Sequence, residues 1–155
     1  MSEIFQLQLR QQLDVYEGDL VEDAQKLIKK YKIYKKECEM EENQIRNVLN
    51  VAANTKSVEV IKAFIQYQIG RSKENVKWAS KSEENMICFG DALICELEQL
   101  RSGNEKVNAS KIAPEVGAMN DLQKHNEIWW RLAILYLGYL NWYFIYRKRK
   151  AEEKQ

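Results

Sequence analysis

Residues 128–146 read IWWRLAILYLGYLNWYFIY, a nearly continuous run of apolar and aromatic side chains. Asp121 is placed to open a helix that continues through this run to about Lys150. A helix this apolar cannot stay fully wet, and it offers the apolar faces of the other helices a central partner. The run therefore predicts an all-α fold: a single compact bundle of five or six helices with a long C-terminal aromatic helix.

The same run is long enough to cross a bilayer, and the basic tail Arg147–Lys150 follows it. Two polar residues inside the run, Arg131 and Asn141, argue against a span because each is costly in hydrocarbon. We therefore expect no membrane partner. The alternative is a membrane-associated or helical protein-interaction module that docks through the aromatic helix. In a packed helix, the core or a subunit contact would contain Trp129, Trp130, Leu135 and Trp142.

Composition fits one helical domain over residues 1–155. Charged residues make up 30% of the chain and hydrophobic residues 45%, which is ordinary for a soluble helical protein. The formal net charge is only +1. Binding of a polyanion would therefore depend on how the charges are distributed, not on their sum.

The three cysteines indicate neither a disulfide framework nor a metal site. Cys88 and Cys95 lie seven residues apart, which is about 10 Å along a helix and beyond the reach of a disulfide. Together with Cys38 and the single His125 they form no metal-binding spacing. Met1–Arg10 lacks the basic start and apolar run of a secretory signal. We expect a cytoplasmic protein with reduced thiols, no metal and no other cofactor.

Apolar spacing divides the chain into four regions. We predict an N-terminal helix pair over residues 1–40, broken at Gly18, and central helices over residues 43–101. Residues 102–119 are polar and predict a loop that is mobile or functional. The C-terminal helix is expected over residues 120–150.

Capping signals place the central helices. Asn43 is expected to cap a short helix, and Ser57 a longer one that continues past Arg71 towards Trp78. Ser80 and Glu83 match a capping box for the next helix.

The sequence contains no recognisable catalytic arrangement. It has no Gly-rich phosphate loop and no spacing that supports a Ser/His/Asp or Cys/His site. His125 stands alone and is expected to be solvated or hydrogen-bonded. We therefore expect a protein that is not an enzyme.

Basic residues of the central helices suggest a binding face. Lys62 lies in the predicted helix that begins at Ser57, and Lys73, Lys77 and Lys81 follow it at four-residue intervals. Residues spaced by four lie on the same side of a helix. Arginines on two neighbouring helices could flank the same groove, and such a face suits a phosphate backbone. An ordinary solvated face is the alternative. The candidate phosphate-binding residues are Arg46, Lys62, Arg71, Lys73 and Lys77, of which the three lysines follow from helix geometry. Arg46 and Arg71 belong to the two segments described next, whose resemblance implies that the phosphates are those of RNA.

Two short segments resemble a known family. Gln44-Ile45-Arg46 before an apolar helix, and Phe64-x-x-Tyr67-x-x-Gly70-Arg71, are similar to segments of the small all-helical subunit of type III-A (Csm-type) CRISPR effector complexes, or of a divergent type III small subunit. The resemblance implies a non-catalytic structural subunit in antiviral defense. Such a subunit would contact the RNA backbone in the guide/target channel and bridge neighbouring subunits. Its partners would be guide RNA, target RNA, other effector-complex subunits and further copies of itself along the filament.

Overall fold

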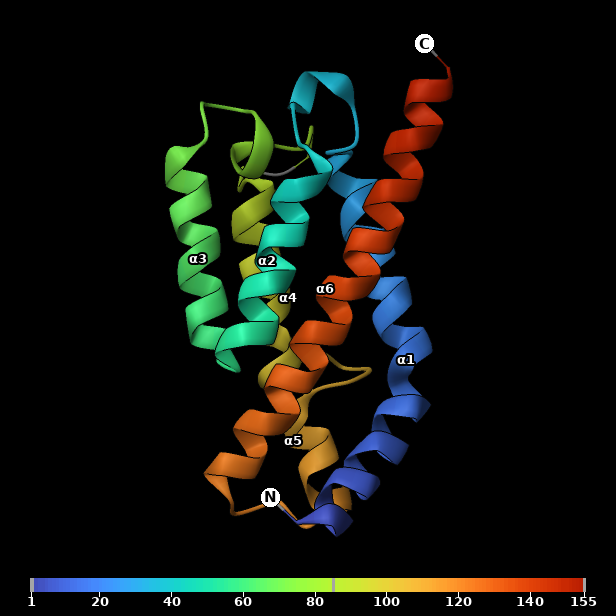
Figure 1. Ribbon diagram of the computed structural model, residues 1–155, viewed down its shortest axis with the longest axis vertical. Helices are drawn as coiled ribbons and strands as arrows, with labels where there is room; N and C mark the ends of the chain where they lie inside the picture. Colours follow the sequence, from blue (N-terminus) through green and yellow to red (C-terminus); the bar gives the residue numbers. More distant parts are fainter. Residues whose placement is uncertain (1, 85, 155) are drawn as a thin grey trace.

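The computed structural model describes residues 2–84 and 86–154 of the 155-residue chain. It is an all-α compact bundle, and the described residues contain no strand beyond one isolated bridge between Lys81 and Cys88. This confirms the predicted fold class and the long C-terminal helix. The helices are α1 (Glu3–Tyr31), α2 (Glu42–Thr55), α3 (Val58–Arg71), α4 (Phe89–Ser102), α5 (Ala109–Ile112) and α6 (Leu122–Glu153), with the 3-10 turns η1 (Lys36–Cys38), η2 (Lys77–Ala79) and η3 (Ala113–Val116) (Figure 1).

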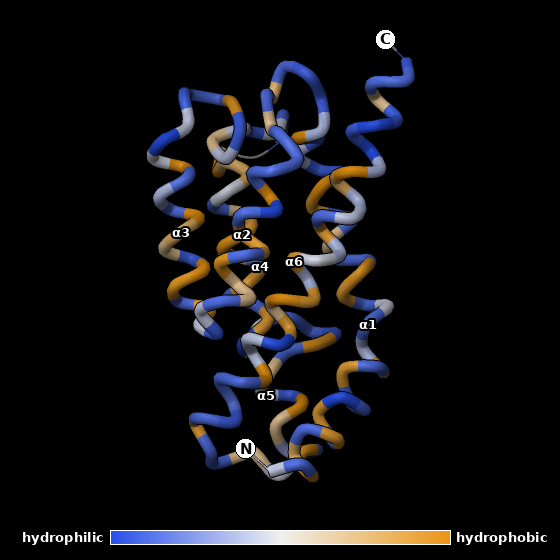
Figure 2. Tube along the Cα trace, viewed as in Figure 1, coloured by the Kyte–Doolittle hydropathy of each residue, from blue (hydrophilic) through white to orange (hydrophobic). Residues whose placement is uncertain are grey.

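The bundle is built around α6, which contacts α1, α2, α3, α4 and α5. Asp121 caps it as predicted, accepting a hydrogen bond from the Lys124 backbone N–H at 3.1 Å. Apolar residues recur along its inner side every three or four positions (Figure 2). Each large side chain buried there contributes roughly 1.5–3 kcal/mol. The buried residues of α6 are Ile128, Trp129, Leu132, Ala133, Tyr136, Leu137, Leu140 and Phe144.

Two tryptophans fix α6 to its neighbours through their indole N–H groups. Trp129 Nε1 donates to the Leu97 carbonyl oxygen at 2.8 Å, and Trp130 Nε1 donates to that of Ala52 at 2.7 Å. The expected place of Trp129 in the core is confirmed, while Trp130 and Leu135 are half-buried and pack against the core. Trp142 is 70% exposed and does not lie in the core of the chain, so for this residue the subunit contact stays a prediction.

The described helices include none that is both long enough and apolar enough to cross a membrane. Arg131, inside the apolar run of α6, donates to Gln6 Oε1 of α1 at 3.3 Å. The polar residue thus has a partner within the protein.

The predicted N-terminal helix pair is wrong: α1 runs without a break through Gly18. Its buried stripe, from Phe5 to Tyr31, continues on both sides of Gly18 and packs against α6. A glycine inside a helix costs about 1 kcal/mol, which is less than this burial supplies. The helix ends at Tyr31, with Lys32 in the left-handed region at φ 52°, well before the predicted end near residue 40.

Two of the predicted boundaries in the central region are also wrong. The cap of α2 is Glu41, which forms a capping box with Gln44, and not Asn43. The predicted capping box at Ser80 starts no helix, because α4 begins at Phe89. Ser57 does cap α3, accepting a hydrogen bond from the Val60 N–H at 3.3 Å.

Residues 102–119 were expected to form a loop, but they contain α5 and η3. Asn108 caps α5 by accepting a hydrogen bond from the Lys111 N–H at 2.8 Å. Asn104 Nδ2 donates to Asp23 Oδ2 of α1 at 2.9 Å. The segment closes one end of the core with its buried side chains, which are Val107, Ala109, Ile112, Ala113, Val116 and Ala118.

Replacing Gly18 or Gly90 by alanine should change the stability of the protein in opposite directions. A Cβ at Gly18 meets open space, so Gly18→Ala should stabilise the protein by about 1 kcal/mol and raise Tm by about 2–4 °C. At Gly90 a Cβ would overlap the Ile69 side chain and lie 3.1 Å from the Trp78 carbonyl oxygen, so Gly90→Ala should lower Tm. Thermal unfolding followed by circular dichroism measures both shifts. A lower Tm for Gly18→Ala would contradict a continuous α1.

Candidate functional site

Lys62 lies on α3 with its charge already paired. Its ammonium group is 3.0 Å from Glu98 Oε1 and 3.2 Å from Glu59 Oε2, and 5.9 Å from the centre of the Trp129 ring. Burial alone would lower the pKa of Lys62, but the hydrogen bonds to Glu98 and Glu59 outweigh it and hold the pKa above its ordinary value. The side chain is only 15% exposed. Lys62 therefore joins α3 to α4.

The other predicted lysines do not form a stripe on α3, because the helix ends at Arg71. Ser72 closes it: the Ser72 N–H donates to the Ile69 carbonyl oxygen and Ser72 Oγ to that of Gln68, at 3.1 and 2.8 Å. Lys73 follows in an irregular segment, and Lys77 begins η2 with φ 52°.

Arg46 and Arg71 lie at the same end of the bundle, where α2 begins and α3 ends (Figure 1). Arg46 is exposed and lines a cleft with Lys148 and Arg149 of α6. Arg71 does not line that cleft; its guanidinium carbon lies 5.3 Å from the centre of the Tyr67 ring. The two predicted arginines therefore lie at the same end of the bundle but do not line the same cleft.

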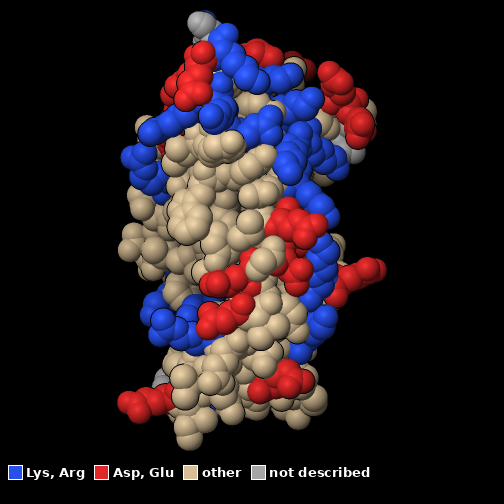
Figure 3. All heavy atoms as spheres, turned by 90° about the vertical axis from the view of Figure 1, so that its right-hand side faces the viewer, with Lys and Arg blue, Asp and Glu red and all other residues tan. Residues whose placement is uncertain are grey.

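Basic residues from five segments meet at this end. They come from the last turn of α1, the loop over residues 32–41, the segment over residues 72–81, the start of α2 and the last turns of α6. Figure 3 shows lysine and arginine side chains gathered over the upper part of the face formed by α1 and α6. We call this region the basic end and define it as Lys29, Lys30, Lys32, Lys35, Lys36, Arg46, Lys77, Lys81, Lys148 and Arg149.

Helix direction accounts for part of this charge. Both α1 and α6 point their C-termini to the basic end (Figure 1). Their last turns carry Lys29, Lys30 and Lys150. Cations at helix C-termini are favourable because the terminal carbonyl groups there carry partial negative charge.

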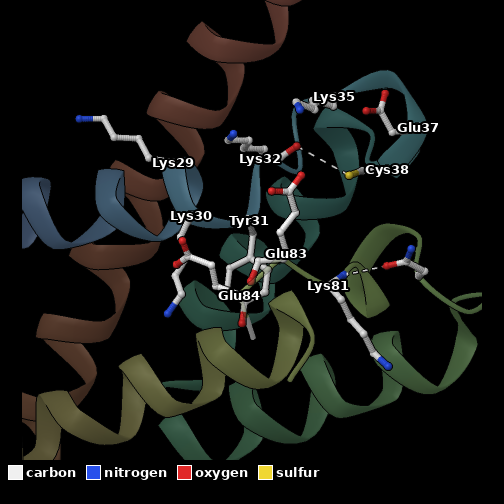
Figure 4. A pocket seen from close by; sticks show the side chains of 12 residues that line it. Lys29, Lys30, Tyr31, Lys32, Lys35, Glu37, Cys38, Lys81, Glu83 and Glu84 are labelled. Carbon is white, nitrogen blue, oxygen red and sulfur yellow. Dashed lines mark hydrogen bonds between the residues drawn. The ribbon is translucent and has the colours of Figure 1, made fainter. Parts of the chain in front are cut away.

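The first cleft of the basic end has a volume of about 360 Å³ and lies between the end of α1 and Lys81 (Figure 4). Lysine side chains surround it, and the Glu83 carboxylate lies among them. Cys38 Sγ donates to the Lys32 carbonyl oxygen at 3.7 Å, and burial raises the pKa of this thiol. The charged residues that line the cleft are Lys29, Lys30, Lys32, Lys35, Lys81, Glu37, Glu83 and Glu84.

Two further clefts, of about 470 and 590 Å³, share Glu41, Lys148 and Glu152. Lys148 Nζ donates to the Met40 carbonyl oxygen at 2.6 Å, which ties α6 to the loop before α2. Arg149 Nε lies 3.3 Å from Glu42 Oε1.

Three cations of these two clefts have no side-chain hydrogen bond or ion pair to any described residue. They are Lys36, Lys77 and Arg46, so their charges are available to a ligand. The backbone around them is strained, because Lys32, Glu39, Asn75 and Lys77 have positive φ angles between 52° and 62°. Such strain costs of order 1–3 kcal/mol per residue and is often found at functional sites.

Chemically, the basic end can bind anions. Across the described residues, no group of three or more His, Cys, Asp or Glu is placed to hold a metal ion.

Cys38, Cys88 and Cys95 are free, as expected. His125 Nε2 shares a hydrogen bond with Ser110 Oγ at 3.1 Å, and burial and then Arg101 lower its pKa. This confirms the expectation that His125 is hydrogen-bonded.

Most of the basic end was not among the residues predicted for the site. The sequence does carry a signal for it, since lysines are dense over residues 26–36 and basic residues fill positions 147–150. What it does not show is that these two segments meet. Of the predicted residues, the structure brings Arg46 and Lys77 into the basic end and leaves Lys62 apart.

Comparison of the chain with protein-family models finds no family that matches. No curated protein matches it, and no solved structure does.

Lys62 and Lys36 should respond differently to loss of charge. Lys62→Gln removes the partner that Glu59 and Glu98 share, so the free energy of unfolding should fall by roughly 1 kcal/mol. Lys36→Gln removes an unpaired surface charge and should change it by less than about 0.5 kcal/mol. Urea unfolding at neutral pH measures both. Equal effects would show that Lys62 is not a structural ion-pair partner.

Proposed function

We propose that this protein binds the phosphate backbone of RNA at its basic end and acts as a non-catalytic structural subunit of a ribonucleoprotein. The observation that carries this is the convergence of basic side chains from five segments, with Lys36, Lys77 and Arg46 unpaired within the described chain. Lysine and arginine are the side chains that contact phosphates, and the release of counterions from the RNA drives such binding.

The carboxylates of the same clefts limit the affinity of a single copy. Glu39, Glu41 and Glu152 lie beside the cations and repel phosphates. Binding would therefore be weak for one molecule and stronger when several copies engage one RNA, because each further binding event is then effectively intramolecular. A structural subunit repeated along an RNA has this character, and it agrees with the net charge of only +1.

The finer proposal is a small subunit of a type III CRISPR effector complex. It rests on the resemblance of residues 44–46 and 64–71. In the fold, Arg46 of the first segment lies in the basic end and Arg71 of the second ends α3 at the same end of the bundle. The proposed partners are guide RNA, target RNA, the other effector subunits and further copies of the chain. Base pairing between guide and target would carry the sequence information, and this protein would contact the backbone.

Salt and charge reversal test the site. Filter binding of a 30-nucleotide single-stranded RNA at 50 and 200 mM salt should show affinity that falls steeply with salt and does not depend on sequence. Lys36→Glu/Lys77→Glu should weaken binding about tenfold. It should also reduce the slope of log affinity against log salt by about 0.7 for each phosphate that the variant no longer neutralises.

The matched control is Arg10→Glu/Lys124→Glu, which changes the net charge equally near the N-terminal ends of α1 and α6. It should retain most of the affinity. An equal loss in this control would show that overall charge, and not the basic end, governs binding.

Arg46→Ala and Arg71→Ala test the family resemblance. Each should change the free energy of unfolding by less than about 0.5 kcal/mol, because both side chains are exposed. Each should also lower the guide RNA retained when the protein co-purifies with type III backbone subunits. A lower Tm with full RNA retention would identify that arginine as a structural residue. Failure to co-purify with any such subunit would reject the CRISPR assignment while leaving RNA binding open to the filter assay.

A further inference from the structure

An aromatic stripe lies on the solvent side of α6, near its C-terminal end. Trp142 is 70% exposed and Tyr146 is 55% exposed. Large aromatic side chains this open are unusual in a helix that otherwise forms the core. With two residues of α1 the stripe forms a shallow groove of about 300 Å³, lined by Tyr139, Trp142, Tyr143, Tyr146, Val21 and Gln25.

The aromatic rings contact one another only at their edges or at a tilt. Tyr139 and Trp142 meet edge to face at 68°, with ring centres 5.5 Å apart. Tyr143 and Tyr146 are 6.2 Å apart at 32°. These arrangements leave the Trp142 side chain largely open to solvent, so the stripe keeps flat apolar surface for a planar group.

Cations accompany the rings on the side of the basic end. Lys29 Nζ lies 5.7 Å from the centre of the Tyr143 ring, the Arg147 guanidinium carbon 5.8 Å from the same ring, and Lys150 Nζ 5.9 Å from Tyr146. Lys29 also lines the first cleft of the basic end. Arg147 donates to the Tyr143 and Tyr34 hydroxyl oxygens at 3.0 and 2.6 Å. The groove therefore continues into the basic end.

The opposite end of the groove is acidic. Tyr139 lies against Glu17 and within the field of Asp14. Figure 3 shows an uncharged area on this face, with lysine and arginine side chains gathered above it and carboxylates mixed with basic side chains below it. The phosphates of an anionic chain bound in the groove would therefore be attracted to the basic end and repelled by the carboxylates of Glu17 and Asp14.

We propose that this groove stacks unpaired bases of single-stranded RNA, while the phosphates of the same strand lie on the basic end. This inference rests on the proposed RNA binding and adds the form of RNA that is preferred. Exposed aromatic rings next to a basic groove bind single strands because every base has a flat face to stack. Bases inside a duplex are already stacked and have no free face to offer.

Two other occupants are outcomes of the test. A second copy whose groove ran parallel about a two-fold axis would bring Lys29, Arg147 and Lys150 against the same cations of its partner, which is repulsive. An antiparallel copy would place them against Glu17 and Asp14, and sedimentation tests for it. An anionic membrane surface would be opposed by Glu17 and Asp14 at the other end of the groove. Unpaired RNA avoids both kinds of repulsion, because its bases can stack in the groove while its phosphates lie against the cations of the basic end.

The experiment uses the full chain and a 12-nucleotide uridine RNA, compared with a 12-base-pair RNA duplex. Trp142→Ala should weaken binding of the single strand about tenfold and that of the duplex less than twofold. Trp142→Phe should retain most of the affinity because a ring remains. The single strand should quench tryptophan fluorescence of the wild type but not of Trp142→Phe. The control is Leu122→Ala, which truncates an exposed side chain of α6 (69% exposed) outside the groove and should change neither affinity.

Equal binding of the single strand by Trp142→Ala and the wild type would overturn the stacking proposal. If Lys36→Glu/Lys77→Glu still weakens both RNAs in that case, backbone binding at the basic end stands without it. If Trp142→Ala instead abolishes self-association in sedimentation, or binding to phosphatidylserine vesicles, with RNA affinity unchanged, the occupant is a second copy or a membrane. Absence of RNA binding by the wild type would reject both proposals.

Discussion

The burial of the inner side of α6 against α1 is the constraint on which the rest of the structure depends. Helices of 32 and 29 residues extend for roughly 48 and 43 Å, so the pair sets the length of the whole bundle. The other helices then fit against α6, where Trp129 and Trp130 each donate a hydrogen bond to a neighbouring helix. A buried indole N–H without a partner would cost about 1–3 kcal/mol, so these bonds favour one arrangement of α2 and α4 around α6.

The direction of this packing creates the candidate site. Because α1 and α6 point the same way, their two basic C-terminal turns meet at one end of the bundle (Figure 1). Like charges gathered in this way repel, and carboxylates such as Glu42 and Glu152 offset part of the cost. Lys36, Lys77 and Arg46 remain without a side-chain hydrogen bond or ion pair to any described residue. The left-handed backbone at Lys32 is the C-terminal cap of α1, and Lys77 adopts the same region at the start of η2. Cations gathered at one end in this way support the proposed binding of a polyanion.

Several sequence expectations failed because tertiary contacts outweighed local signals. Gly18 suggested a helix break, but the apolar stripe of α1 continued across it and its burial decided the outcome. Residues 102–119 looked like a loop because their polar residues and Pro114 outweighed a few scattered apolar side chains. Those few apolar residues are nevertheless the ones that close the core. The predicted lysine stripe failed for a similar reason, since buried Trp78 holds the segment after α3 against Phe89, with the ring centres 5.7 Å apart.

The sequence by itself determined that the chain is helical, where α6 begins and that its apolar run forms the centre of the bundle. These features follow from side-chain periodicity and capping, which act over a few residues. Which charges come together was decided only by the tertiary structure. Lys148 reaches the Met40 carbonyl and Arg149 the Glu42 carboxylate across 108 and 107 positions of sequence. No local pattern encodes such contacts, because they depend on the relative direction of whole helices and on the paths of the segments between them.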